Sequence, residues 1–151
     1  MNRLIDLLDE SASIYKNFLE LEYKKYDTVI KNDIDTLEDI VAQEQAFYMK
    51  MRGIEQKREK LLSSMGYKDK SFREIIEAVE GNEKNLLLEK YDEFTKLITD
   101  VKKIVSLCKT LIDVRMHRIN NAMEQLGEKE NTYSNTEVKS NTKSLLFSKK
   151  I

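Results

Sequence analysis

The 151-residue chain has no proline and no tryptophan, and it contains only four glycines, one cysteine and one histidine. So little proline and glycine disfavours a sheet protein, because such a fold needs many tight turns. A single cysteine excludes an intrachain disulfide, which is typical of a reducing compartment. The formal net charge of −1 provides no general attraction for nucleic acid or for an anionic membrane.

Long apolar runs are absent as well. No uninterrupted apolar segment approaches the roughly 20 residues that a membrane-spanning helix needs. Near the N-terminus Asp6, Asp9 and Glu10 interrupt the leucines, so no secretory signal is predicted. We therefore expect a cytoplasmic protein that does not insert into a membrane.

The chain also lacks the residue patterns on which most enzymes depend. A metal site needs three or four ligands, but His117 and Cys108 are the only histidine and cysteine. The Glu-x-x-His motif of di-iron bundles does not occur, and the isolated glycines form no phosphate-binding loop. We therefore expect no enzyme activity, no metal and no cofactor, and we interpret His117 as a solvated surface residue.

Helical periodicity, in contrast, is abundant. Charged residues make up 35% of the chain and apolar residues 40%. In the last third, an apolar residue recurs at alternating steps of four and three, with one arginine among twelve positions. This 3.5-residue spacing is typical of long helices that pack side by side. The positions are Leu87, Tyr91, Phe94, Ile98, Val101, Val105, Cys108, Ile112, Arg115, Ile119, Ala122 and Leu126.

Two more long helices are predicted earlier in the chain, over residues 3–31 and 34–65. Asn32 and Asp33 separate them, and both residue types favour helix N-caps. Gly66 follows the second helix, where a left-handed C-cap is expected. Ser71 and Glu74 have the spacing of a capping box, which predicts a short third helix before the last long one.

Together these patterns predict an all-α fold, an antiparallel helical bundle or coiled coil of three long helices plus one short helix. We assign residues 1–127 to the bundle, with Gly127 closing the last helix. Residues 128–151 are mostly polar and hold too little apolar surface to offset the cost of ordering them. They are predicted to form a flexible C-terminal tail.

Helix lengths predict an exposed apolar surface at the end of the last helix. At 1.5 Å per residue, the second helix spans about 48 Å and the last about 60 Å. If they run antiparallel with Met65 beside Leu87, the last turns project beyond their neighbour. The seam arginines then have two alternatives. Either Arg115 pairs with Asp35 and Glu38 and Arg58 pairs with Asp6 and Asp9, or both side chains extend to water along the edge of the bundle. The side chains predicted to lack an internal partner are Ile119, Ala122, Met123 and Leu126.

At this point the chain resembles the FlgN-type flagellar export chaperones. Residues 54–62 are similar to the family's segment of a hydrophobic residue, Glu-x-x-Arg and, after two more residues, Leu-Leu. Thr132-Tyr133 is similar to the start of the family's tail. The front half also carries the family's general pattern, which comprises Leu4, Leu7, Leu8, Tyr15, Phe18, Leu19, Leu21, Leu37, Ile40 and Glu44. The family's long last helix is matched by Leu111, Ile112, Arg115, Ile119 and Leu126.

The resemblance implies a chaperone that binds the C-terminal helical segments of hook–filament junction proteins, keeps them unassembled and delivers them to the export gate. Tyr133 is then the residue that docks onto the cytoplasmic domain of the gate's membrane protein. The alternative is a structural homodimer that uses the same surface and has no client. A client helix would pack, in a helix-in-groove mode, against Ile112, Met116, Ile119, Met123 and Leu126.

Overall fold

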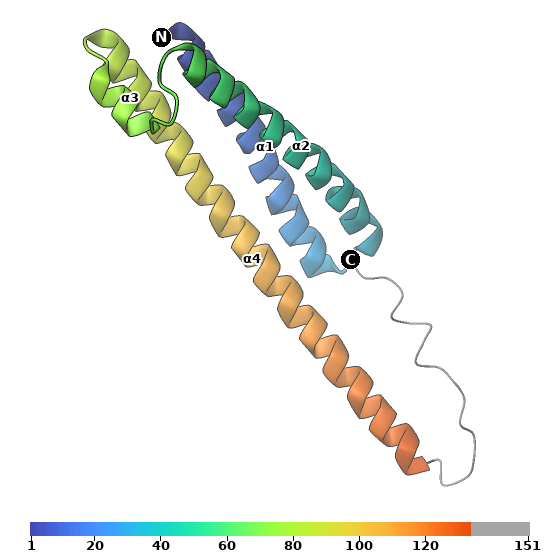
Figure 1. Cartoon of the computed structure of the whole chain (residues 1–151). Helices are drawn as coiled ribbons and strands as arrows, with labels where there is room; N and C mark the ends of the chain where they lie inside the picture. Colours follow the sequence, from blue (N-terminus) through green and yellow to red (C-terminus); the bar gives the residue numbers. More distant parts are fainter. Residues whose placement is uncertain (134–151) are drawn as a thin grey trace. The chain divides into compact units, whose positions relative to one another are not determined.

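The computed structural model describes residues 1–133, and the side chains of residues 1–127. This part of the chain holds four helices and no strand (Figure 1). They are α1 (Asn2–Lys31), α2 (Ile34–Ser64), α3 (Phe72–Ala78) and α4 (Asn82–Tyr133). The predicted all-α fold of three long helices and one short helix is therefore confirmed. The chain divides into two compact units, Met1–Asp113 and Val114–Ile151, which we describe separately.

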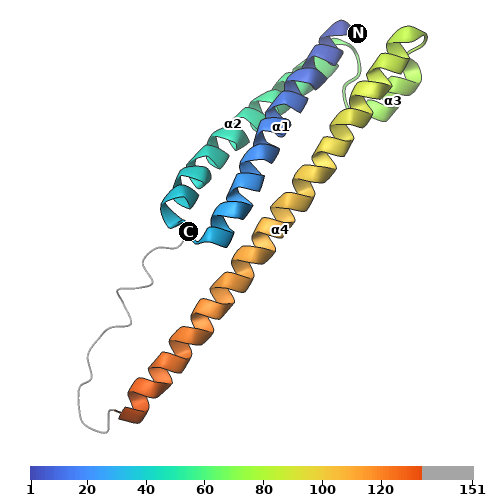
Figure 2. The ribbon, with the colours of Figure 1, turned by 180° about the vertical axis from the view of Figure 1, so that it is seen from behind.

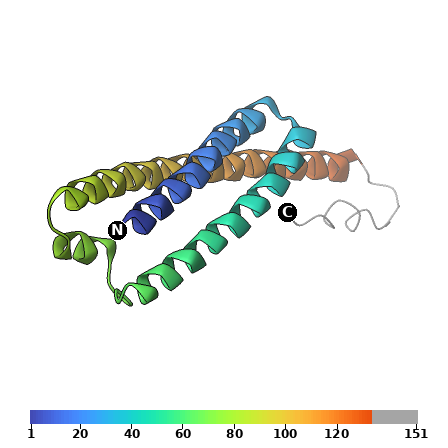
Figure 3. The ribbon, with the colours of Figure 1, turned by 90° about the horizontal axis from the view of Figure 1, so that it is seen from above.

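Helices α1 and α2 form an antiparallel hairpin with a two-residue turn (Figure 3). Asn32 adopts the left-handed conformation with φ 57°, and its N–H donates to the carbonyl of Val29 at 3.2 Å. Asp33 is the N-cap of α2, because its carboxylate accepts a hydrogen bond from the Thr36 N–H at 3.1 Å. Asp33 therefore acts as the N-cap that its type predicts, whereas Asn32, whose type also favours an N-cap, is instead the left-handed C-cap of α1.

The first part of α4 runs in the same direction as α1 and packs against it. The Lys90 ammonium lies 3.0 Å from the carboxylate of Asp9, and the rings of Tyr15 and Phe94 meet edge to face at 5.4 Å. Further along, the Cys108 thiol donates to the Glu22 carbonyl at 3.5 Å. Since α1 and α2 are antiparallel, α2 and this part of α4 are antiparallel too.

The register between α2 and α4 agrees with the one expected from helix lengths. Glu44 of α2 and Cys108 of α4 both interact with Glu22, so they lie at one level. Glu44 stands 21 residues before Met65, and Cys108 stands 21 residues after Leu87. Placing Met65 beside Leu87 therefore places these two residues side by side as well.

One of the two seam arginines, Arg58, does not pair with the acidic residues of the neighbouring helix. The Arg58 guanidinium bonds to Glu55 on its own helix at 2.6 Å, not to Asp6 or Asp9 of α1. Asp9 is instead paired with Lys90 of α4. Because Arg58 and Glu55 are one turn apart, their pairing is local and does not select the alignment of the helices.

The core of this unit consists of two apolar clusters. Near α3, the fully buried side chains of Leu4, Ile75 and Leu87 bring three helices together. Figure 2 shows α3 lying beside the first turns of α4. The second cluster lies further along the hairpin, where Phe18, Leu21, Ile40 and Val101 join α1, α2 and α4.

The predicted start and stop signals around α3 are present. Gly66 follows the end of α2 with φ 78°, a left-handed conformation that favours glycine. The Ser71 hydroxyl accepts from the Glu74 N–H at 3.3 Å, and the Glu74 carboxylate accepts from the Ser71 N–H at 2.7 Å. These two reciprocal bonds form the predicted capping box.

We expect the two glycines of this region to respond in opposite ways to alanine. Gly66→Ala should lower the free energy of unfolding by about 1–2 kcal/mol, because an alanine is strained at positive φ. Gly53→Ala, within α2 and with open space around it, should raise that free energy by up to about 1 kcal/mol. Urea denaturation followed by circular dichroism measures both. Equal effects of the two changes would contradict this assignment.

The end of α4 differs from the prediction. Gly127 was expected to close this helix, but α4 continues to Tyr133. A glycine inside a helix costs only about 1 kcal/mol relative to alanine. The glutamates and lysine that follow are good helix formers and continue the helix. The rest of the predicted tail, residues 134–151, lies outside the described residues.

Candidate functional site

The part of α4 beyond Asp113 carries five large apolar side chains that remain exposed; Val114 lies on one face, and the other four lie together on the opposite face. The exposed fractions are 52% for Met116, 53% for Ile119, 42% for Met123 and 63% for Leu126. Their spacing of three and four residues places them on one face of the helix. Ile112, one turn earlier, is half-buried. We call Met116, Ile119, Met123 and Leu126 the apolar stripe; Ile112, the fifth residue of the predicted client site, belongs to the unit Met1–Asp113.

The apolar series that begins at Leu87 is buried in its first part and exposed toward its end. Val101 is 7% exposed and Cys108 is 1% exposed, whereas the positions from Ile119 onward are open to solvent. The small residue of the series, Ala122, is exposed too. The exposure expected from helix lengths is therefore confirmed. That a client covers the stripe stays a prediction.

The polar residues beside the stripe form no metal or catalytic constellation. His117 is exposed, and its Nε2 lies 3.3 Å from Nδ2 of Asn121 on the next turn. In the part of the chain that the structure describes, no group of three or more histidine, cysteine, aspartate or glutamate side chains could hold a metal ion.

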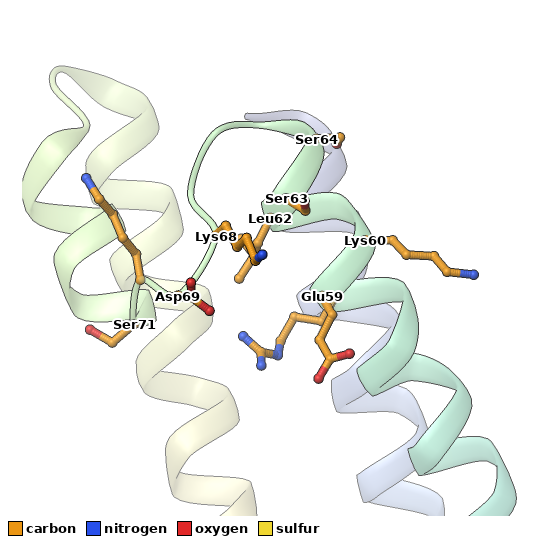
Figure 4. A pocket seen from close by; sticks show the side chains of 10 residues that line it. Glu59, Lys60, Leu62, Ser63, Ser64, Lys68, Asp69 and Ser71 are labelled. Carbon is orange, nitrogen blue, oxygen red and sulfur yellow. The ribbon is translucent and has the colours of Figure 1, made fainter.

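A hollow of about 860 Å³ lies at the far end of α2 and the loop that follows it (Figure 4). Its lining includes lysines and an arginine, which could suggest an anion site. However, Arg58 is already bonded to Glu55, and Lys60 points away from the loop that carries Lys68. The positive groups therefore do not converge as a phosphate site requires.

The interior contains a cluster of charged groups that the sequence pattern did not predict. Glu22 is 1% exposed and Glu44 is 5% exposed, and the Lys25 ammonium bonds to a Glu44 carboxylate oxygen at 2.8 Å. Burial, followed by a hydrogen bond with Glu44, raises the pKa of Glu22 to about 8. Burial also raises the pKa of the Cys108 thiol to about 11, so this cysteine is neutral while it is buried.

A sequence signal for this cluster exists, although it is weak. In α1 the core spacing of four and three residues runs through Tyr15, Phe18, Glu22 and Lys25 to Val29. Charged residues at such seam positions have to be buried or to break the seam. Because they usually extend to water, the spacing alone does not distinguish a buried pair from an exposed one.

Tyr133, the residue expected to dock onto an export gate, is the last residue of α4. Its side chain and the segment 134–151 lie outside the described residues. None of the helices within residues 1–133 combines the length and apolar character that a membrane span requires.

A comparison with known proteins identifies the family of the chain. A model of the FlgN protein family matches residues 1–139, which is nearly the full sequence and includes all four helices. No curated protein and no solved structure matches it.

Proposed function

Because the chain belongs to the FlgN family of flagellar export chaperones, we propose that it carries hook–filament junction proteins to the export gate. It would bind the C-terminal helical segments of these clients and keep them unassembled in the cytoplasm. The observation that supports this proposal is the exposed apolar stripe on α4. Exposed large apolar side chains in a row on one face are typical of a surface that another molecule covers.

The spacing of the stripe fits a helical client. An amphipathic helix places its own apolar residues at steps of three and four, so it can pack along Met116, Ile119, Met123 and Leu126. Two methionines within this face favour clients of slightly different shape, because the methionine side chain is flexible and polarizable. A client segment that is unfolded before binding loses conformational entropy, which limits affinity and allows release.

Delivery to the gate is proposed to depend on the segment after the stripe. Tyr133 is the position that matches the family's docking tyrosine, and it lies seven residues beyond Leu126. Client binding and gate docking are thus assigned to neighbouring but different residues. This separation makes the two activities testable one at a time.

We expect a chain truncated after Gly127 to retain client binding but to lose delivery. The truncation keeps the whole stripe and the core, so helix packing in Met1–Asp113 and the Kd for a client C-terminal segment should not change. Export of the client from flagellated cells should fall to the level of a strain without the chaperone. Calorimetric titration measures the first quantity, and client protein in the medium measures the second.

Tyr133→Ala in the full chain tests whether the loss of that single side chain abolishes delivery, with Tyr23→Ala as the control, because Tyr23 of α1 is 54% exposed. Normal export by both the truncated chain and the Tyr133 variant would refute the docking role. Loss of client binding on truncation would instead place part of the client site beyond Gly127.

A further inference from the structure

The carboxyl group of Glu22 has an oxygen atom without a donor. Its Oε1 is buried and has no hydrogen-bond partner among the described residues. Glu22 extends from α1 into the contact with α2 and α4, where its residue is 1% exposed. An ionised carboxylate oxygen in such a place is costly, because nothing replaces the water it has lost.

The charges around Glu22 do not balance if every group is ionised. Among the described residues, Lys25 on α1 is the cation that acts on Glu22, and it is bonded to Glu44 on α2 at 2.8 Å. Cys108, the group facing from α4, is a neutral thiol, and the phenol of Tyr48 on α2 interacts with the same carboxylates. Two carboxylates and one ammonium would therefore leave one negative charge in the interior.

A proton on Glu22 resolves both problems. The protonated carboxyl is a donor, so it can bond to the neighbouring Glu44, and one negative charge remains to pair with Lys25. Adjacent carboxyl groups commonly share a proton in this way, because like charges in contact cannot both be ionised.

We propose that the folded protein holds one proton between Glu22 and Glu44, and that this proton holds the Cys108 segment of α4 against the α1–α2 hairpin. With the proton present, Glu22, Glu44 and Lys25 have no net charge together, and the thiol of Cys108 donates to the Glu22 carbonyl at 3.5 Å. Without it, an unpaired negative charge lies in the contact, and separation of α4 restores water to Glu22.

The direction of the pH dependence follows from the raised pKa of Glu22, which is about 8 in the packed state against an ordinary value near 4.5. The packed state binds more protons than the open state between these values. Packing of α4 is thus fully favoured below the ordinary pKa and weakens as the pH rises. The packing equilibrium should change by up to about tenfold per pH unit and level off above pH 8.

The single cysteine offers a direct probe of this opening. Cys108 is 1% exposed and is the only thiol in the chain, so its modification rate reports separation of α4. Rates are divided by those of the urea-unfolded chain at the same pH, which removes the effect of thiol ionisation. We expect the resulting protection factor to fall between pH 5 and 8 by up to about tenfold per unit.

Glu22→Gln should make the protection factor independent of pH over this range. Glutamine stays neutral, and its amide N–H can donate to Glu44 as the protonated acid does. Glu20→Gln is the matched control, because Glu20 is an exposed residue of the same helix, and this variant should keep the wild-type slope. A pH-independent protection factor in the wild-type chain, or an unchanged slope in Glu22→Gln, would overturn the proposal.

Two further measurements do not depend on how well Glu22→Gln folds. Glu44→Gln removes the adjacent negative charge, so the pH above which the protection factor stops falling should be lower than in the wild-type chain. If that pH does not change, proton sharing is contradicted. The wild-type protein at pH 7 should also show the infrared carbonyl band of a protonated carboxylic acid. The absence of that band in the folded protein would overturn the proposal.

Discussion

Replacing Ile119 and Met123 with aspartate is expected to abolish client binding while the helix content stays the same. The two side chains are 53% and 42% exposed, so the free protein loses little packing when they change. In the proposed complex, however, both would be covered by the apolar face of a client helix. The variant thus separates a binding surface from a structural one.

The expected loss is large because two effects add. Full burial of one such apolar side chain contributes about 1.5–3 kcal/mol, and an aspartate in its place must also lose water without gaining a partner. Since about 1.4 kcal/mol changes Kd tenfold, the double variant should bind at least about 100-fold more weakly. Calorimetric titration with the C-terminal segment of a hook–filament junction protein measures the change.

Asn121→Asp with Gln125→Glu is the matched control for this experiment. These substitutions add the same two negative charges on the same turns, but on a different face of α4. The control should keep the wild-type Kd. Wild-type affinity in the Ile119 and Met123 variant would remove the stripe from the client site. If the wild-type chain binds no client and the Ile119 and Met123 variant loses dimerisation, the structural homodimer would be favoured instead.

The second large effect is expected in the core, where Leu87→Ala should destabilise the bundle by about 2–5 kcal/mol. Leu87 is fully buried against residues that include Leu4 of α1 and Ile75 of α3. The alanine would leave a cavity at the point where these helices meet. A loss of this size is a large fraction of the roughly 5–15 kcal/mol by which domains are usually stable.

The neighbouring leucines provide controls for the core prediction. Leu86 and Leu88 are each 43% exposed, so their replacement by alanine should cost less than about 1 kcal/mol. Chemical denaturation of the three variants under identical conditions compares them directly. Similar losses at all three positions would show that Leu87 is not the core residue of this segment.

Most of the architecture could be predicted because local signals agree with the packing. The caps at Asp33 and Ser71 satisfy backbone groups within a few residues, so their effect does not depend on distant parts of the chain. The spacing of apolar residues was a less reliable guide to which side chains are buried along a long helix. The 3.5-residue series selects Val105, but the structure buries Ile104 at 3% and exposes Val105 at 39%. A straight helix has 3.6 residues per turn, so it drifts from such a series.

The candidate site was predictable in position but not in full. The difference in helix lengths was sufficient to predict that Ile119, Met123 and Leu126 are exposed. In contrast, the pairing of Glu22 with Glu44 joins residues of two helices, and nothing in either local sequence specifies the partner. The end of α4 was missed because Gly127 is a common stop signal but is not an obligatory one.

The two-residue turn between α1 and α2 has a consequence for the order in which the protein forms during translation. Short loops close at little entropic cost, so the hairpin can pair as soon as residue 64 has left the ribosome. Helix α4 is synthesised afterwards, and residues 116–126 are among its last. We expect the α1–α2 hairpin to be folded before the seam of α4 is synthesised. The apolar stripe should leave the ribosome only after the hairpin against which α4 packs has formed.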